Sequence, residues 1–212
     1  MLTATKERAI RILRHEVAGI LDGRQTQLRR VVKPQPIEGY DLPGSWSWIP
    51  RGAKKLDDRV GWCPRHVWNA SMAPMASGAA SGILVDCPYG KPGDLLWGQE
   101  AWTSNCGAVG EDHRACIRYR EGYDFMDGIL KWKQSTRMPR WAARIILEIT
   151  SVRLERLQDL SEDDAIANGA QCAGVPAALT NRGAFGKMWE RVNGAGTWSA
   201  NPWVWALSFR KV

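Results

Sequence analysis

The sequence predicts an α+β domain built round a curled mixed or antiparallel sheet that forms a small β-barrel. Three observations favour this class: many segments resemble short strands, the helical segments are few and short, and no repeated strand–helix–strand alternation runs along the chain. With 212 residues, 44% of them hydrophobic, the chain can bury one sizeable core. We therefore expect a single domain over residues 1–212, with short flanking helices and long loop insertions.

The expected strands are marked by β-rich composition or by alternation of apolar and polar residues. In the longest, Ile145, Leu147 and Ile149 share one face. In the last, Trp203 and Trp205 alternate with smaller residues, the pattern of a half-buried strand whose tryptophans belong to the core. The strands are expected at 8–13, 27–33, 83–85, 95–103, 116–119, 143–157 and 203–209.

Three helices are expected from apolar spacing and from residues that start or stop a helix. The first covers 15–21 and ends at an Asp-Gly pair. Ser161 is the N-cap of the second, with Asp164 in the position of the capping-box acid, and Gly169 stops this helix after about two turns. The third covers 181–192. Its apolar residues have the spacing of a buried stripe: Phe185, Met188, Trp189 and Val192.

Two basic segments account for the net charge of +7. Residues 1–33 carry a net +5 and residues 134–157 a net +3, so the rest of the chain is close to neutral. If these segments converge in space, they form an electrostatic surface for a phosphate backbone or a nucleotide. Charge alone leaves a scattered, solvated surface as the alternative.

Two stretches, 37–81 and 103–136, are expected to be loop insertions, and the first lies in a segment rich in Pro, Gly, Ser and Ala that has no sustained hydrophobic period. A connection as long as the first is either functional or an added decoration. It holds four of the 12 tryptophans of the chain: Trp46, Trp48, Trp62 and Trp68. Stacking on a ligand and packing beneath a loop are both open interpretations of these side chains.

The composition also bears on the compartment. No apolar run approaches the roughly 18 residues of a membrane helix, and charges within 1–15 replace the apolar centre of a signal peptide. A cytoplasmic protein is therefore expected. An odd number of cysteines does not make the paired framework of a secreted scaffold, so reduced thiols are expected. The five cysteines are Cys63, Cys87, Cys106, Cys116 and Cys172.

One constellation has the residue types of a zinc site. Cys63-x-x-His66 and His113-x-x-Cys116 have finger-like spacing. The two pairs run in reversed order and are separated by a long loop, so buried thiols and surface imidazoles are the favoured interpretation. No glycine-rich phosphate loop, serine triad or acidic metal cluster is visible in the sequence. The sequence thus predicts neither a metal site nor a cofactor.

Several short motifs in a fixed order point to a family. They include Gly23-Arg24-Gln25-Thr26 after the first helix, Gly93-Asp94-Leu95-Leu96-Trp97 at a strand entry, and Leu160-Ser161-Glu162-Asp163-Asp164-Ala165 at a helix cap. In these the chain resembles the ASCH family of PUA-like proteins. It resembles more closely the phage and prophage ASCH-like proteins often labelled morphogenetic, through segments 29–36, 87–90 and 201–205. The resemblance runs from about residue 8 to the end and is weak in the two insertions.

The resemblance implies a small β-barrel with flanking helices, and a basic cleft lined by the loop after the first helix and by the capped helix. It also implies a role with RNA, a nucleotide or a modified nucleoside. Some members remove an acyl group from the exocyclic nitrogen of cytidine. They use a Lys and a Thr of a Gly-Arg-Lys-Thr-x-Thr loop, with a Glu near the end of the capped helix.

At these three positions the chain has Gln25, Leu28 and Asn168. None can serve as the base, the hydroxyl nucleophile or the acid, so family catalysis is not expected. Exchanging a Lys–Glu pair for two neutral amides avoids an uncompensated charge, and we expect Gln25 and Asn168 to face each other across the cleft. Restoring all three residues together should be more effective than any single change. The expected ligand-binding residues are Arg24, Gln25, Thr26, Arg29, Arg30, Tyr89, Glu100 and Asn168.

Two other functions remain open. The first is an active nucleoside amidohydrolase or ribonuclease that uses Thr26, Glu100 or a residue of the insertions. The second is a protein-binding phage factor that acts on a host protein in the bacterial cytoplasm. Its contact surface would be the tryptophan-rich insertion, since exposed Trp is favoured at interaction hot spots.

Overall fold

The structure is a computed structural model. It describes residues 5–33, 35, 87–104, 116–170 and 180–212, together with the short strands β3 (Ser47–Trp48) and β4 (Pro64–Arg65). The expected strand at 83–85 lies outside this part of the chain. So do the side chains of the four tryptophans of the first insertion.

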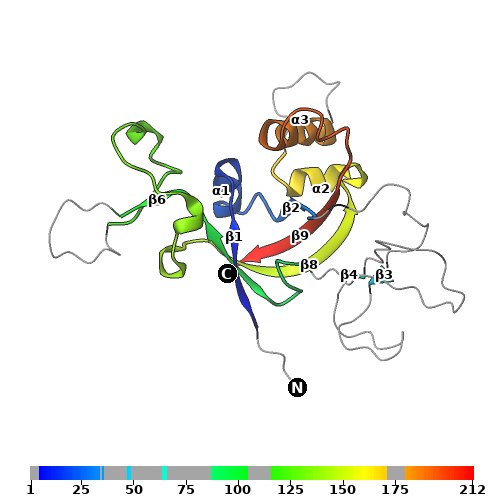
Figure 1. Cartoon of the computed structure of the whole chain (residues 1–212), viewed down its shortest axis with the longest axis horizontal. Helices are drawn as coiled ribbons and strands as arrows, with labels where there is room; N and C mark the ends of the chain where they lie inside the picture. Colours follow the sequence, from blue (N-terminus) through cyan, green and yellow to red (C-terminus); the bar gives the residue numbers. More distant parts are fainter. Residues whose placement is uncertain are drawn as a thin grey trace, which may run out of the picture.

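Five strands form one mixed sheet, as the fold class predicted (Figure 1). Their order across the sheet is β1 (Glu7–Arg11), β5 (Leu95–Gln99), β8 (Ile146–Arg156), β9 (Trp203–Lys211) and β2 (Gln27–Val31). The first pair is parallel and the other three pairs are antiparallel. A register shift between Ile149 and Ser151 interrupts the β8–β9 ladder, a feature that bends a strand and increases its twist.

The sheet is not a closed barrel. Among the described strands, β1 and β2 are the two edges and do not pair with each other. A side chain links them instead, because Arg30 of β2 donates from Nη2 to the carbonyl of Arg11 at 2.9 Å. Helix α1 (Arg14–Leu21) follows β1 directly and buries Val17 and Ile20 in the core. Helix α1 therefore covers apolar surface of the sheet that the strands of a closed barrel would cover.

Side chains from β2 and from the turn before it bond to the outer edge of this strand. The Val32 amide donates to the Trp203 carbonyl, and the Thr26 carbonyl accepts from the Phe209 amide. Because successive residues of a strand direct their backbone N–H and C=O groups to opposite edges, those of Gln27 and Arg29 point away from β9. The carbonyl of Gln27 accepts from Gln25 Nε2 at 3.1 Å, and that of Arg29 accepts from Arg30 Nη1 at 3.0 Å. The polar backbone of this edge is therefore partly satisfied without another strand.

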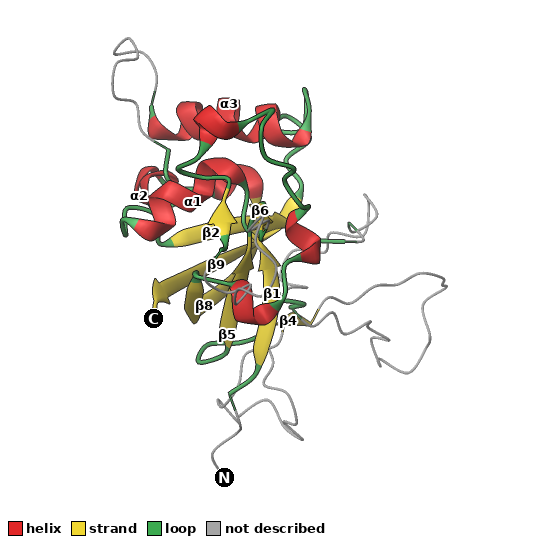
Figure 2. Cartoon of the chain, turned by 90° about the vertical axis from the view of Figure 1, so that its left-hand side faces the viewer, coloured by secondary structure: helices red, strands yellow, loops and turns green. Residues whose placement is uncertain are grey.

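Two helices cover the face of β9 that carries Val204. They are α2 (Glu162–Ala167) and α3 (Asn181–Asn193), and Figure 2 shows α2 beside β2 with α3 beyond it. Val204 packs in a cluster with residues of both helices and is fully buried, as is Ala206. The last strand was expected to be half-buried. This was wrong for its central part, because helices shield the face opposite the tryptophans.

The helix boundaries follow the expected start and stop signals. Ser161 Oγ accepts from the Asp164 amide at 3.0 Å, as an N-cap does. The Asp164 carboxylate accepts hydrogen bonds from Gln27 and Arg153 and not from the backbone amide of Ser161. Only one of the two hydrogen bonds of a capping box is therefore formed. The buried stripe of α3 includes Phe185 and Trp189, whereas Val192 is exposed.

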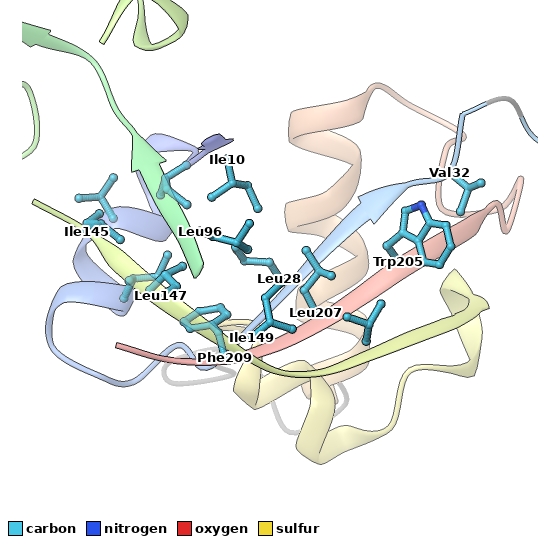
Figure 3. Packing of buried hydrophobic residues seen from close by; sticks show 14 residues of the cluster. Ile10, Leu28, Val32, Leu96, Ile145, Leu147, Ile149, Trp205, Leu207 and Phe209 are labelled. Carbon is cyan, nitrogen blue, oxygen red and sulfur yellow. The ribbon is translucent and has the colours of Figure 1, made fainter. Parts of the chain in front are cut away.

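The main core lies between the sheet and α1. Figure 3 shows Leu28, Leu96, Leu147 and Leu207 converging there, with Trp205 at one end of the cluster. The expectation that Trp205 belongs to the core is confirmed.

The described residues of the second insertion form an arm on the sheet (Figure 1). Strand β6 (Trp102–Thr103) pairs antiparallel with β7 (Arg118–Tyr119). The 3₁₀ helices η1 (Asp124–Met126), η2 (Ser135–Arg137) and η3 (Arg140–Ala142) follow, and η4 (Leu157–Asp159) comes after β8. Trp102, Met138 and Ala142 form a small core of their own. The one strand expected at 95–103 is two strands, because Glu100 and Ala101 separate β5 from β6.

Cys116 is disulfide-bonded, through a partner outside the described residues. The expectation that all the cysteines are reduced thiols is therefore wrong, and Cys116 has no thiolate to offer a metal. The other three residues of the zinc constellation, Cys63, His66 and His113, lie outside the described part of the chain. Within that part, no three His, Cys, Asp or Glu side chains are grouped as metal ligands. None of the helices described has the length and hydropathy needed to span a bilayer.

Candidate ligand-binding cleft

A cleft of about 70 Å³ lies along the outer edge of β2, between α1 and α3. Helix α1 contributes His15 and Glu16, and α3 contributes Phe185 and Trp189. The other polar residues of the wall are Gln25, Arg29, Arg30, Asn168 and Asn193. The volume admits a small flat group rather than a whole nucleotide.

Glycines allow Gln25 to enter this wall. A Cβ on Gly19 would lie 3.1 Å from Gln25 Cβ, and one on Gly169 would lie 3.0 Å from Gln25 Oε1. Gly169 also has φ +82, which a side chain rarely adopts. Asn168 is the C-cap residue of α2, and its amide donates to the Asp164 carbonyl at 3.0 Å. The turn after α1 and the end of α2 thus bring Gln25 and Asn168 to one cleft, as the sequence predicted.

Both amide nitrogens are bound within the protein. Gln25 Nε2 donates to the Gln27 carbonyl at 3.1 Å, and Asn168 Nδ2 donates to Gln27 Oε1 at 2.8 Å and to the Asp164 carbonyl at 2.6 Å. The oxygen of each amide, by contrast, accepts no hydrogen bond from any described residue. Each side chain therefore has a carbonyl acceptor left for a ligand.

Gln27 sets the orientation of Asn168. Arg29 Nη1, which can only donate, bonds to Gln27 Oε1 and so identifies this atom as an acceptor. Asn168 must then direct its NH₂ group at Gln27, which leaves its oxygen unused. The sequence reasoning missed Gln27. The available signal was its position in β2, two residues from both Gln25 and Arg29 and on the same face of the strand.

The two arginines in the wall are already paired. The Arg29 side chain is 1% exposed and bonds to Glu155 and Asp164; burial lowers its pKa, and these carboxylates oppose that shift. Arg30 donates to both oxygens of Glu16 at 2.8 Å, and this partner raises its pKa despite burial. The expectation of a basic cleft needs correction, since both charges are offset by carboxylates.

Four expected ligand-binding residues lie elsewhere. Arg24 is exposed and pairs with Asp22 at 2.6 Å, and Thr26 is exposed beside it, outside the cleft. Both lie in the turn before β2, where their side chains are exposed while the intervening Gln25 is buried. Tyr89 packs against the main core, where burial raises its pKa. Glu100 is buried, and both of its carboxylate oxygens accept hydrogen bonds from Arg144 at 2.8 Å.

Leu28 also lies outside the cleft. It occupies the position of the second Thr of the resemblance, but it is fully buried in the main core, on the face of β2 opposite Gln27. A hydroxyl at this position would point at apolar side chains and not at a ligand.

The α3 wall carries further unused hydrogen-bonding capacity. The rings of Phe185 and Trp189 lie 5.9 Å apart between centroids. Trp189 Nε1 and Arg29 Nε are buried without a hydrogen-bond partner among the described residues. Such orphan donors are uncommon in folded proteins. The sequence suggested that Phe185 and Trp189 were core residues, which their burial confirms, but periodicity could not show that they also line a cleft.

Comparison with known proteins leaves the family open. No family model, curated protein or solved structure matches the chain. The ASCH-like resemblance stays a prediction, and the cleft must be interpreted from its own chemistry.

Proposed function

We propose that the cleft binds a nucleobase, carried by RNA, a nucleotide or a modified nucleoside, without the Lys/Thr/Glu amidohydrolysis implied by the ASCH-like resemblance. One observation carries the proposal: four residues lining a single cleft leave hydrogen-bonding atoms unused. These are the carbonyl oxygens of Gln25 and Asn168 and the N–H groups of Arg29 and Trp189.

The chemistry of these groups suits a base better than a phosphate. Amide oxygens accept from the amino and ring N–H groups found on base edges, and they repel phosphate oxygens. Phe185 and Trp189 provide an apolar, aromatic wall beside them. Flat heterocycles are commonly held between such a wall and a few directional hydrogen bonds.

The same residues give no support for acyl transfer. The described residues that line the cleft include no Ser, Thr, Cys or Lys. Glu16 is held by Arg30, so its carboxylate is not available to deprotonate a hydroxyl. An enzyme of the Lys/Thr/Glu type would need a nucleophile in this wall.

The first test uses nucleosides as probes. We expect cytidine, adenosine or N4-acetylcytidine to bind without hydrolysis of the acetyl group, as measured by calorimetry and by chromatography of the incubated nucleoside. Gln25→Met should weaken binding about three- to tenfold, because one hydrogen bond of about 0.5–1.5 kcal/mol is lost. Gln99→Met, outside the cleft, is the matched control. Absence of binding by every nucleoside, or equal binding by both variants, would refute the proposal, and turnover of N4-acetylcytidine would refute its non-catalytic part.

A pH series tests whether the site is neutral. His15 in the wall has its pKa lowered chiefly by burial, with Arg30 and Arg191 adding to the shift and Glu16 opposing it. Because the pKa of His15 is lowered, its imidazole is neutral above the ordinary value near pH 6.5. The folded state is fully stable with respect to this group above that pH and loses stability as the pH falls below it. Nucleoside affinity should therefore be flat between about pH 6.5 and 8.5. A tenfold change in this window would contradict binding by neutral amides.

A further inference from the structure

A second, larger cleft lies between the start of α1 and the arm of β6 and β7. Its volume is about 490 Å³. One wall is formed by Arg11, Ile12, Arg14 and Val17, and the other by residues 100–101, 120–121 and 132–136. The two clefts therefore lie on either side of the same short segment, the first turn of α1.

The charges of the second cleft are unequal. Its wall contains four cations, Arg11, Arg14, Arg120 and Lys133, and two carboxylates, Glu100 and Glu121. Glu100 is held by Arg144, and Glu121 lies 3.9 Å from Arg14. The side chain of Arg11 makes no hydrogen bond to a described acceptor. Lys133 Nζ donates to the Ser104 hydroxyl at 3.0 Å and lies 4.5 Å from the centroid of the Trp102 ring. These two exposed cations have no carboxylate partner in the described structure.

An aromatic residue accompanies these cations. Trp132 lines the cleft half-buried, and its Nε1 donates to Asp127 at 2.8 Å, which fixes the ring. Ser135 and Thr136 add hydroxyl groups to the same wall. Cations that follow a backbone, combined with an aromatic surface for stacking, are typical of proteins that bind single-stranded nucleic acid.

A hydrogen bond joins a residue of the first cleft to one of the second. Arg30 lines the first cleft, and its guanidinium reaches the carbonyl of Arg11, which lines the second. His15 and Glu16 face the first cleft, while Arg14 and Val17 face the second. A chain that leaves the first cleft over the start of α1 thus meets the cations of the second.

We propose that the second cleft binds the sugar–phosphate backbone of a single-stranded RNA whose base occupies the first cleft. This rests on the proposed base-binding function and narrows the ligand from a free nucleoside to a strand. RNA fits better than an acidic peptide, because a peptide offers charge to Arg11 and Lys133 but no base for stacking on Trp132 or for bonding to Gln25 and Asn168.

The test compares two double variants of equal charge. Arg11→Ala with Lys133→Ala removes cations of the cleft, and Lys6→Ala with Lys187→Ala removes two exposed cations outside both clefts. The probe is a fluorescein-labelled RNA strand of about 12 nucleotides, titrated at several salt concentrations. The cleft variant should bind about tenfold more weakly at low salt, and the magnitude of its salt slope should fall by about 1.4, as two phosphate contacts are lost. The control variant should match the parent protein, and both variants should keep the parent thermal unfolding midpoint.

Stacking has its own readout. Trp132→Ala should weaken binding of the strand at least fivefold, and Trp132→Phe should restore most of the loss. A duplex of the same sequence should bind more weakly than the single strand, because its bases are not free to stack.

Three results would overturn the proposal: equal strand binding by the cleft and control variants, equal binding of strand and duplex, or equal competition by a polyglutamate peptide. Nucleoside binding separates this inference from the proposed function. If nucleosides bind but the cleft variant leaves strand binding unchanged, only the second cleft is refuted. If nucleosides do not bind, the base-binding function fails, and with it the combined model.

Discussion

Replacing Arg30 by alanine is expected to destabilise the folded chain by about 3–5 kcal/mol. The Glu16 side chain is 6% exposed and bonds to Arg30 through both oxygens, so the variant leaves a buried carboxylate without its partner. The substitution also removes the donors that reach the carbonyls of Arg11 and Arg29. An unpaired buried charge of this kind is among the most costly consequences of a single substitution.

Urea denaturation and thermal unfolding measure the effect, which corresponds to a midpoint lower by about 6–20 °C. The double variant Arg30→Met, Glu16→Gln should recover most of the loss, because no charge remains buried. Arg210→Ala is the matched control: Arg210 is 69% exposed in its pair with Glu148, and its loss should cost less than about 1 kcal/mol. A cost below 1 kcal/mol for Arg30→Ala would show that this ion pair does not stabilise the fold.

Leu28→Thr is expected to cost about 2–4 kcal/mol, since it removes buried apolar volume and places a hydroxyl among Leu96, Leu207 and Ile149. Urea denaturation measures the change, and Leu28→Val, with no polar atom, should cost clearly less. Equal costs for Thr and Val would mean that the hydroxyl finds a partner and that position 28 is not purely apolar.

This result bears on the ASCH-like resemblance. From the motif alone, restoring Gln25→Lys, Leu28→Thr and Asn168→Glu together should exceed any single change. In the structure, Gln25 and Asn168 share the cleft, but Leu28 lies in the core. We therefore expect no gain in N4-acetylcytidine hydrolysis when Leu28→Thr is added to the other two substitutions.

The sequence predicted the regular elements more closely than the site. Apolar alternation and cap residues depend on neighbours along the chain, so α3 and β9 lie within two residues of their expected ends. Gln25 and Asn168 both line the cleft, because the turn after α1 and the C-cap of α2, two positions that the motif order singled out, meet there. The partners of Arg29 were not predictable: Glu155 and Asp164 are 126 and 135 residues away, and only the folded sheet brings them together.

The link between β1 and β2 has a dynamic consequence. Since one guanidinium joins the two sheet edges, they can separate without breaking any strand ladder, at a free energy below that of global unfolding. The amide protons of Arg29 and Val31, which face away from β9, should therefore exchange with solvent deuterium earlier than those of β9 itself. Because Arg30 lines the first cleft and bonds to Arg11 of the second, such an opening event changes the walls of both clefts at once.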